Sequence, residues 1–339
     1  MKKAFFLLCT VLLVLGSILP LAGYQIASSL LSGTAAEVSP SSSAAPSGSG
    51  LLVPTAPSYT DDSEFFRIED QSTGQIQQVP RREYLLGAAA AEMPIDWPDE
   101  ALKAQIVAAH SYALYCRDHA SSPETFWLSA DPARRQGYLT DPVLRSYWGT
   151  NYESNYARLS ALVDSVSAQV LCYDGAAAGT SYFALSNGRT EASENVWGTA
   201  LPYLTAVDSQ SDLSAENYEV TLSLSTAQVQ TALSGLGLMP SLSASELWFG
   251  TPERTPSGYV SALPVCGQSL SGTTLRRALG LRSTDFSISY AAGNFTIVTH
   301  GYGHGVGLSQ WGAKAMAEQG SHYEEILAHY FPGTVLCGT

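Results

Sequence analysis

The chain has 339 residues, of which 45% are hydrophobic, so it is long enough for one large domain or two smaller domains with cores. Its 30 acidic and 17 basic side chains give a formal net charge of -13, which repels phosphate backbones and argues against nucleic-acid binding. Only 14% of residues are charged, so much of the polar surface is uncharged, and this suits hydroxyl-rich ligands such as glycans.

The N-terminus begins with two lysines that precede an uncharged, mainly apolar run over 4–23. A helix of that length crosses a bilayer, and the lysines favour the cytoplasmic side. A cleaved signal peptide is the alternative, because small residues near Ala22 and Gly23 offer a cleavage site. We predict a cytoplasmic tail over 1–3, an uncleaved transmembrane anchor over 4–23 and an extracytoplasmic remainder.

The next segment, 24–62, is rich in serine, proline, glycine and alanine and has no helical or strand period, which predicts a flexible tether. The folded domain then spans 63–339. Strand-like and helical segments between 208 and 290 predict a smaller secondary lobe. Because helices and strands are interleaved without regular βαβ units, the predicted class is α+β, with mixed helices and antiparallel strands.

The first predicted elements are a hairpin over 65–80 and two helices, over 82–93 and 98–119. Pro98 and the two acids after it suit the start of the second helix. The stripe predicted to be buried on this helix consists of Leu102, Ile106, Ala109, Ala113 and Cys116.

Further along the chain, two strands are predicted around Asp174-Gly175, another strand over 294–300, and a helix over 309–319 that is closed by Gly320. Ser321 and Glu324 have the spacing of a capping box for a final helix.

Five cysteines are present, and four of them lie beyond the apolar N-terminal run, at Cys116, Cys172, Cys266 and Cys337. They allow up to two disulfides, whose pairing stays open. Cys116 and Cys172 lie in apolar sequence, so we expect both to be buried free thiols.

One acid stands out at the end of the first predicted helix. The stretch LLGAAAAEMP (85–94) ends a run of small helix formers on Glu92. The alanines leave little bulk around the carboxylate, and Pro94 ends the helix behind it. A surface glutamate needs neither feature, so Glu92 is a candidate for chemistry, and a plain helix end is the alternative.

A second candidate region is HGYGHGVGLSQWGAKAMA (300–317), where glycine alternates with other residues. A backbone without Cβ atoms approaches a ligand closely and offers its amides. His304, Ser309 and Gln310 add side chains that suit sugar binding. The alternative is a tight turn with a helix cap, and for Trp311 we favour a buried core position.

The third region, ALSNGRTEASENVWG (184–198), follows a predicted strand. Asn187 and Gly188 suit a turn with positive φ. The side chains expected to project from this turn are Ser186, Arg189, Thr190 and Glu191. A solvated loop without a function is the alternative.

Metal binding receives little support. His300 and His304 have the spacing of a helical ligand pair, but four glycines argue against a helix there, and no third ligand is near in sequence. Cys116 with His119 is likewise a single pair. We expect no metal and no cofactor.

Four stretches together resemble the stage II sporulation protein D family, in the family's order and over nearly all of 63–335. They are EYLLGAAAAEMPIDWPDEALKAQIVAAHSYAL, SNGRTEASENVWG with PYL after it, LRRALGLRSTDF, and GYGHGVGLSQWGAKAMAEQGSHYEEILAHYFPGT. The resemblance implies a lytic transglycosylase that cleaves peptidoglycan glycan strands between N-acetylmuramic acid and N-acetylglucosamine, after stem peptides are removed. It also implies two partners during forespore engulfment, the stage II sporulation amidase (protein P) and membrane protein M. The implied location is the mother cell's engulfing membrane, with the catalytic domain on its extracytoplasmic side.

The family's catalytic glutamate, in its AxEMP motif, corresponds to Glu92. The residues that we predict to bind substrate are Lys103, His110, Ser186, Asn187, Gly188, Arg189, Thr190, Glu191, His304, Ser309 and Gln310.

One carboxyl group is enough for this chemistry. A hydrolase usually uses two, whereas here the C6 hydroxyl of muramic acid replaces water and forms a 1,6-anhydro product. The carboxyl protonates the glycosidic oxygen and then accepts the hydroxyl proton, for which desolvation would raise its pKa. The alternatives are a non-catalytic glycan-binding enhancer of an amidase, and a hydrolase with Glu191 as the second acid.

The sequence departs from the family's pattern at three places. Many relatives have arginine where His110 stands, so a permanent cation becomes a titratable group. Asn187 replaces the first glycine of a Gly-Gly pair and is expected in a left-handed conformation. Some relatives carry a zinc site after the second helix, but 128–149 here has no cysteine or histidine.

Overall fold

The computed structural model describes residues 59–339, except 62, 123 and 132–134. The predicted tail over 1–3, the anchor over 4–23 and most of the tether over 24–62 lie outside the described residues. Within the described part of the chain, no helix is both long and apolar enough to cross a membrane.

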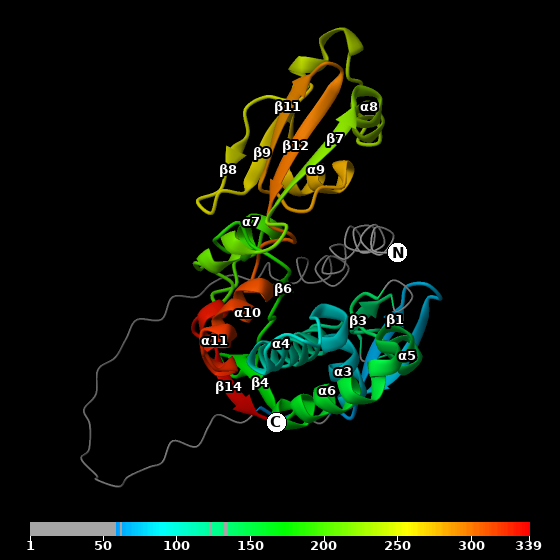
Figure 1. The fold of residues 1–339 in the computed structure, drawn as a ribbon, viewed down its shortest axis with the longest axis vertical. Helices are drawn as coiled ribbons and strands as arrows, with labels where there is room; N and C mark the ends of the chain where they lie inside the picture. The colour runs from blue at the N-terminus through cyan, green and yellow to red at the C-terminus, as the bar shows by residue number, and fades with distance from the viewer. Residues whose placement is uncertain (1–58, 62, 123, 132–134) are drawn as a thin grey trace, which may run out of the picture.

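Helices alternate with mostly antiparallel strands, so the predicted α+β class is confirmed. The structure has two lobes with separate hydrophobic cores, drawn at opposite ends of Figure 1. We call the larger one the core lobe, and the smaller one, built from Glu219–Ser225 through Asn294–His300, the secondary lobe. The predicted lobe over 208–290 overlaps the latter, while its first residues pack against the core lobe.

The core lobe carries both chain ends of the described part. Its elements are β1 (Phe65–Asp70), β2 (Gln75–Pro80), α3 (Arg81–Glu92), α4 (Asp99–Asp118), β3 (Leu128–Ala130), α5 (Asp141–Trp148), η2 (Gly149–Asn151), α6 (Tyr152–Val166), β4 (Gln169–Tyr173), β5 (Ala176–Ala177), β6 (Tyr182–Phe183), α7 (Ser193–Trp197), η3 (Gln210–Ser214), β13 (Leu308–Ser309), α10 (Gln310–Glu318), α11 (Tyr323–Tyr330) and β14 (Val335–Gly338).

Helix α4 is the centre of the core lobe and packs against α3, α6, α10, α11 and β4. Its alanines are fully buried, and their small side chains let the neighbouring helices approach closely. Helix α3 lies beside it and ends at Glu92, where Met93 turns to extended backbone ahead of Pro94. The end of α3 is therefore held in position by its packing against the buried helix α4.

Short sheets surround these helices. The first has the order β2-β1-β3, with β3 parallel to β1, and the second has the order β14-β4-β5. A disulfide between Cys172 and Cys337 joins β4 to β14, so the expectation of a free thiol at Cys172 is wrong. Cys116 is free, as expected, but half-buried rather than buried, and Cys266 is also free.

The secondary lobe comprises two antiparallel sheets, β11-β12-β7 and β10-β9-β8, with two packed helices. Its elements are β7 (Glu219–Ser225), α8 (Thr226–Ser234), η4 (Leu242–Leu247), β8 (Glu253–Arg254), β9 (Val260–Val265), β10 (Gln268–Ser271), α9 (Gly272–Leu279), β11 (Phe286–Ala291) and β12 (Asn294–His300). Helix α9 begins at Gly272, where a Cβ atom would come within 2.0 Å of the Val260 carbonyl oxygen, so only glycine fits against β9.

One predicted cap is displaced by one residue. The capping box of α11 is formed by His322 and Glu325, and not by Ser321 and Glu324. His322 is the last residue with extended backbone before the helix, and its amide donates to Glu325 Oε2 at 2.8 Å.

Candidate active site

Glu92 lies at the C-terminal end of α3 and is partly exposed. Its Oε2 accepts a hydrogen bond of 3.1 Å from Nε2 of Gln310, at the start of α10. The same Nε2 donates to Oε1 of the buried Gln105 on α4 at 3.3 Å, which fixes the orientation of the Gln310 amide. No other hydrogen bond to the Glu92 side chain exists within the described residues, so Oε1 is available to a ligand.

The pKa of Glu92 is raised because burial desolvates its carboxylate, while the hydrogen bond from Gln310 favours the ionised form and offsets part of that effect. No cation of the described chain forms an ion pair with it. Burial is the main cause of the raised pKa values of Tyr84, Tyr182 and Tyr302. The negative charge of Glu92 makes a smaller contribution in the same direction. Glu92 is therefore protonated more readily than an exposed glutamate, and Gln310 can stabilise the carboxylate once the proton has left.

Two tryptophans lie close to this carboxyl group along the chain. Trp97 follows Glu92 by five residues, Trp311 follows Gln310, and their rings meet edge to face at 5.3 Å. Lys314 lies over both rings, at 5.9 Å from Trp97 and 5.3 Å from Trp311. Trp311 is only half-buried, so the preferred core position is wrong, and the pair offers an aromatic surface of the kind that sugars bind.

A second buried acid, Asp212 of η3, organises the loop after β6. Its Oδ2 accepts hydrogen bonds from the Ser186 amide at 2.9 Å, the Ser186 hydroxyl at 2.5 Å, the Ser309 hydroxyl at 2.7 Å and the Ser209 hydroxyl at 3.1 Å. Burial raises the pKa of Asp212, and these donors counteract it. Ser186 and Ser309, both predicted to bind substrate, are thus fully buried around Asp212.

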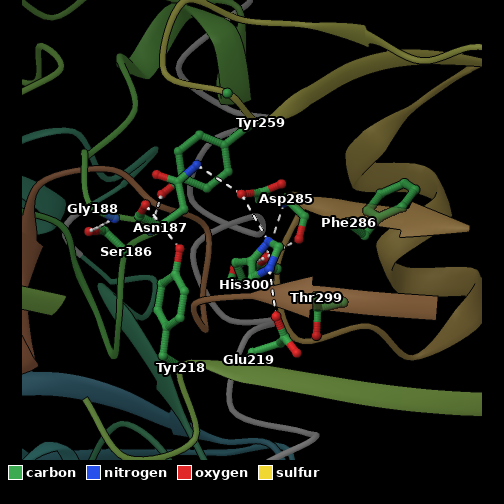
Figure 2. A network of polar contacts seen from close by, with 12 residues as sticks. Ser186, Asn187, Gly188, Tyr218, Glu219, Tyr259, Asp285, Phe286, Thr299 and His300 are labelled. Atoms are coloured by element: carbon green, nitrogen blue, oxygen red, sulfur yellow. Dashed lines mark hydrogen bonds and ion pairs between the residues drawn. The ribbon is translucent and has the colours of Figure 1, made fainter. Parts of the chain in front are cut away.

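The next residue in this loop, Asn187, joins the two lobes. Its side-chain amide donates to the Ser257 carbonyl at 2.9 Å and to Asp285 Oδ2 at 3.1 Å, as Figure 2 shows for the second contact. The hydroxyl of Tyr218 donates to the Asn187 carbonyl. Asn187 is absent from the residues with positive φ, so the expected left-handed conformation is wrong, and Gly188, with φ of 103°, makes the turn alone.

The same network continues into the secondary lobe. Figure 2 shows His300 between Asp285 and Glu219, with distances of 3.5 Å from Nδ1 to Asp285 Oδ2 and 3.2 Å from Nε2 to Glu219 Oε2. The ring of Tyr218 stacks on His300. Within the described residues, no group of three or more His, Cys, Asp or Glu side chains is arranged to hold a metal ion.

Glu191 is buried and has a different environment from Glu92. Its Oε1 accepts from the Ala192 amide and the Asn195 side chain, each at 2.8 Å, and its Oε2 accepts from the Thr255 hydroxyl of the secondary lobe. Both oxygens are therefore engaged, and these contacts favour a structural link between the lobes over a second catalytic acid.

His304 is held by the backbone on both sides of its ring. Nδ1 accepts from the Val306 amide at 3.1 Å, so Nε2 carries the proton and donates to the Tyr182 carbonyl at 3.0 Å. Burial and the nearby Arg276 lower the pKa of His304 to about 3. The ring stays neutral and packs beside Phe183 and Trp197.

A pocket of about 280 Å³ lies between the lobes, and we call it the junction pocket. Its core-lobe wall includes Glu191, Asn195, Trp197 and His304, and its secondary-lobe wall includes the first turn of α9 and Arg276. Glu92 does not line it. One chain segment contributes to both places. His304 lines the pocket, and Gln310, six residues later, donates to Glu92.

Two of the residues predicted to bind substrate have partners elsewhere. Lys103 pairs with Glu100 at 2.7 Å and lies over the ring of Tyr323 in α11. His110 is fully buried, with Nδ1 3.2 Å from the Gln169 carbonyl and Nε2 3.3 Å from Asp61 Oδ2. Substrate contacts at these two positions remain predictions.

The buried Asp61 explains why a histidine fits at position 110. Burial opposes the charge of Asp61, but hydrogen bonds from His110, the Ser63 amide and Arg81 outweigh it and hold the pKa of Asp61 far below its usual range. The contact between His110 and Asp61 therefore joins the start of the folded domain to α4.

The last two predicted residues of the turn lie at its far end. Arg189 is exposed and pairs with Asp208 at 2.9 Å, so its guanidinium is near the surface. Thr190 is buried, and its hydroxyl accepts from the Val207 amide at 2.8 Å. The structure thus brings Gln310 alone, among the predicted substrate residues, into hydrogen-bond contact with Glu92.

Sequence reasoning missed Gln105, Asp212, Tyr259 and Arg276. Gln105 carried a usable signal, since a glutamine amid the apolar face of α4 needs a buried partner. The hydroxyl of Tyr259 accepts from the Asn187 amide at 3.3 Å and donates to the Arg189 carbonyl at 3.0 Å. Asp212 and Tyr259 gave no signal, because their contacts depend on segments that meet only in the folded chain.

Comparison with known proteins places these residues in a family context. The profile of the family described as "Stage II sporulation protein" (SpoIID) matches residues 69–173. The chain is 36% identical to the stage II sporulation protein D of Bacillus amyloliquefaciens, over 77% of this chain and 75% of the relative. It is 34% identical to the protein of that name from Bacillus subtilis (strain 168), over 79% and 77%. It is 29% identical to an amidase enhancer of Bacillus subtilis (strain 168), over 74% of this chain but 40% of the relative.

Proposed function

The chain belongs to the stage II sporulation protein D family, and on that premise we propose that it is a membrane-anchored lytic transglycosylase. Its substrate would be peptidoglycan glycan strands from which stem peptides have been removed. It would cleave the bond from N-acetylmuramic acid to N-acetylglucosamine and form a 1,6-anhydro end. The observation that carries the proposal is the desolvated Glu92 with one donor and one free oxygen.

The proposed reaction uses Glu92 twice. The protonated carboxyl donates to the glycosidic oxygen as that bond breaks, and the resulting carboxylate accepts the proton of the muramic acid C6 hydroxyl as this oxygen attacks C1. Gln310 stabilises the carboxylate formed between these steps, because it donates to Oε2. Water takes no part, so no second carboxyl group is needed.

The surroundings of Glu92 support sugar binding. Trp97 and Trp311 provide half-buried aromatic faces against which a pyranose ring could pack. Lys314, over both rings, adds a donor for sugar oxygens at the same place. No metal or cofactor is required for this chemistry.

The cellular setting is proposed on the same premise. The disulfide between Cys172 and Cys337 suits an oxidising compartment, which supports an extracytoplasmic domain. We propose a single-pass anchor over 4–23 in the mother cell's engulfing membrane, with the amidase (protein P) and membrane protein M as partners. The amidase would supply the stripped strands.

A direct test is digestion of peptide-free glycan strands with the full chain in detergent, followed by mass spectrometry. Release of 1,6-anhydro ends, each one water lighter than a hydrolysed end, supports the proposal. Hydrolysed ends would instead favour a hydrolase with two acids, and Glu191 would be its second acid.

A second function is favoured by the similarity to an amidase enhancer. In that case the chain binds glycan without cleaving it and increases the activity of an amidase. Absence of any glycan product, together with stimulation of the amidase by a Glu92→Gln variant, would select this function over the first.

A further inference from the structure

The junction pocket contains a buried cation without a counter-charge. Arg276 of α9 is 7% exposed and lines this pocket. Its Nε donates to the Leu281 carbonyl at 3.3 Å and to the Arg282 carbonyl at 3.1 Å, while its buried Nη2 has no hydrogen-bond partner within the described residues. A buried, unpaired guanidinium is costly unless an anion completes its hydrogen bonds.

The acids in the pocket do not supply this anion. Glu191 lies in the same pocket, but its two oxygens are taken by Ala192, Asn195 and Thr255. No ion pair joins Arg276 to an acidic side chain of the described chain. Burial lowers the pKa of Arg276 to about 10, which still leaves it charged at neutral pH. No acidic side chain among the described residues supplies the missing partner, which leaves room for an anionic ligand.

Two neighbouring features add to the attraction for an anion. The first turn of α9 lines the pocket through Gly272, Thr273 and Thr274, and the N-terminus of this eight-residue helix carries partial positive charge. The exposed Arg277 lies at the same wall and lowers the pKa of Arg276 by repulsion. A positive pocket of this kind contrasts with the net charge of -13.

We propose that Arg276 and the first turn of α9 bind the lactyl carboxylate of a muramic acid residue in a glycan strand. This proposal rests on the proposed function. On a complete strand the stem peptide converts that carboxylate to a neutral amide, so only a stripped residue presents the charge. Arg276 is thus a specificity-determining residue that recognises removal of the peptide.

The size and lining of the pocket suit such a ligand. About 280 Å³ lies at the small end of ligand pockets, enough for one sugar with a short acid side chain. Trp197 is half-buried at the core-lobe wall, beside His304, and offers a ring face to the pyranose.

Tyr302 is an electrostatic neighbour of both Glu92 and the junction-pocket residue Arg276. Burial raises the pKa of Tyr302. The positive charges of Arg276 and Arg282 lower this pKa, and the negative charge of Glu92 raises it. The Tyr302 hydroxyl therefore lies within electrostatic reach of the proposed acid and of the proposed carboxylate site.

The test measures binding, so its outcome does not depend on whether Glu92 cleaves. The full chain with Glu92→Gln, in detergent, is titrated with three strands of equal length: peptide-free glycan, the same glycan with its lactyl carboxylates converted to methylamides, and an N-acetylglucosamine oligomer. We expect preference for the first, and Arg276→Gln should weaken its binding about 10- to 100-fold. Binding of the two uncharged strands should not change.

A second variant keeps the test decisive if Arg276→Gln folds poorly. Arg277 is exposed, so Arg277→Glu should preserve the fold and still weaken binding of the carboxylated strand by adding repulsion. The matched control is Arg145→Gln, because Arg145 is an exposed arginine of α5 that pairs with Asp141. Thermal unfolding of each variant checks the fold.

Equal binding of all three strands, or no effect of either pocket variant, would overturn the proposal. Inorganic phosphate that binds at Arg276 without being displaced by the carboxylated strand would also overturn it, since the anion would then be a phosphate. Release of anhydro ends by the wild-type chain with no carboxylate preference would leave the proposed function intact and reject the pocket alone.

Discussion

Glu92 and Asp212 are two acids of the core lobe whose pKa values burial raises, yet their surroundings differ. Glu92 is partly exposed and accepts one hydrogen bond, from Gln310. Asp212 is fully buried, and its Oδ2 accepts from Ser186, Ser209 and Ser309. Burial alone therefore does not identify a catalytic acid.

The contrast shows which properties do. A group that transfers protons must meet its ligand and must have an oxygen that the protein leaves free, and Glu92 fulfils both conditions. Asp212 also has an oxygen without a hydrogen-bond partner within the described residues, Oδ1, but that atom is buried and cannot meet a ligand. Its Oδ2 accepts hydrogen bonds from three serines, so the loss of Asp212 should affect folding first. The variants that follow test whether Glu92 has a catalytic role and Asp212 a structural one.

The largest effect is expected for Glu92→Gln. The amide cannot transfer a proton, so release of 1,6-anhydro ends should fall about 100- to 10,000-fold, the usual contribution of general acid–base catalysis. Mass spectrometry of digested peptide-free glycan measures the rate. Glu83→Gln, on the exposed face of the same helix, is the control and should keep full activity. Unchanged turnover of Glu92→Gln would reject the assignment.

Asp212→Ala should lower stability, since the hydroxyls and the amide around it lose a buried acceptor. We expect a loss of about 1–3 kcal/mol in the free energy of unfolding, measured with urea. Asp208→Asn, at an exposed acid that pairs with Arg189, is the control and should change it by less than about 0.5 kcal/mol. A stable Asp212→Ala chain without activity would contradict the structural role.

The local elements of the core lobe were predictable. The hairpin β1–β2 and helices α3 and α4 follow from turn residues, apolar period and proline positions within short stretches. Glu92 and Gln310 both appeared as candidates because their motifs are local. The disulfide was not predictable, since Cys172 and Cys337 are 165 residues apart and become neighbours only when β14 pairs with β4.

The junction between the lobes was the main failure, and its cause is physical. Asn187 was assigned a turn conformation from its neighbours, but its amide bonds to Ser257 and Asp285, which lie 70 and 98 residues away. Contacts of this range decide the conformation of a polar side chain more strongly than local preference does. The unpaired Arg276 was not predicted for the same reason. Whether an arginine has a counter-charge depends on which side chains surround it in the folded chain.

Gln310→Met should shift the pH dependence of activity. Gln310 stabilises the ionised form of Glu92, so its removal raises the pKa of Glu92 further. The first step needs the protonated acid, and activity falls as pH rises through this pKa. The alkaline limb of kcat should therefore move to higher pH. Gln319→Met, at the exposed end of α10, is the control. If the alkaline limb stays in place or moves to lower pH, Gln310 does not stabilise the ionised form of the catalytic acid.

The smallest effect concerns stability and follows from the sign of the same pKa shift. The pKa of Glu92 is raised in the folded chain, so its contribution to stability is complete below the unfolded value, about 4.3, and is lost as pH rises through the folded value. Glu92→Gln removes this loss and should unfold at higher urea concentration than wild type at pH 8, with little difference at pH 4. Glu83→Gln should show no such pH dependence. A wild-type chain that is the more stable one at pH 8 would mean that the fold stabilises the Glu92 carboxylate and that burial does not raise its pKa.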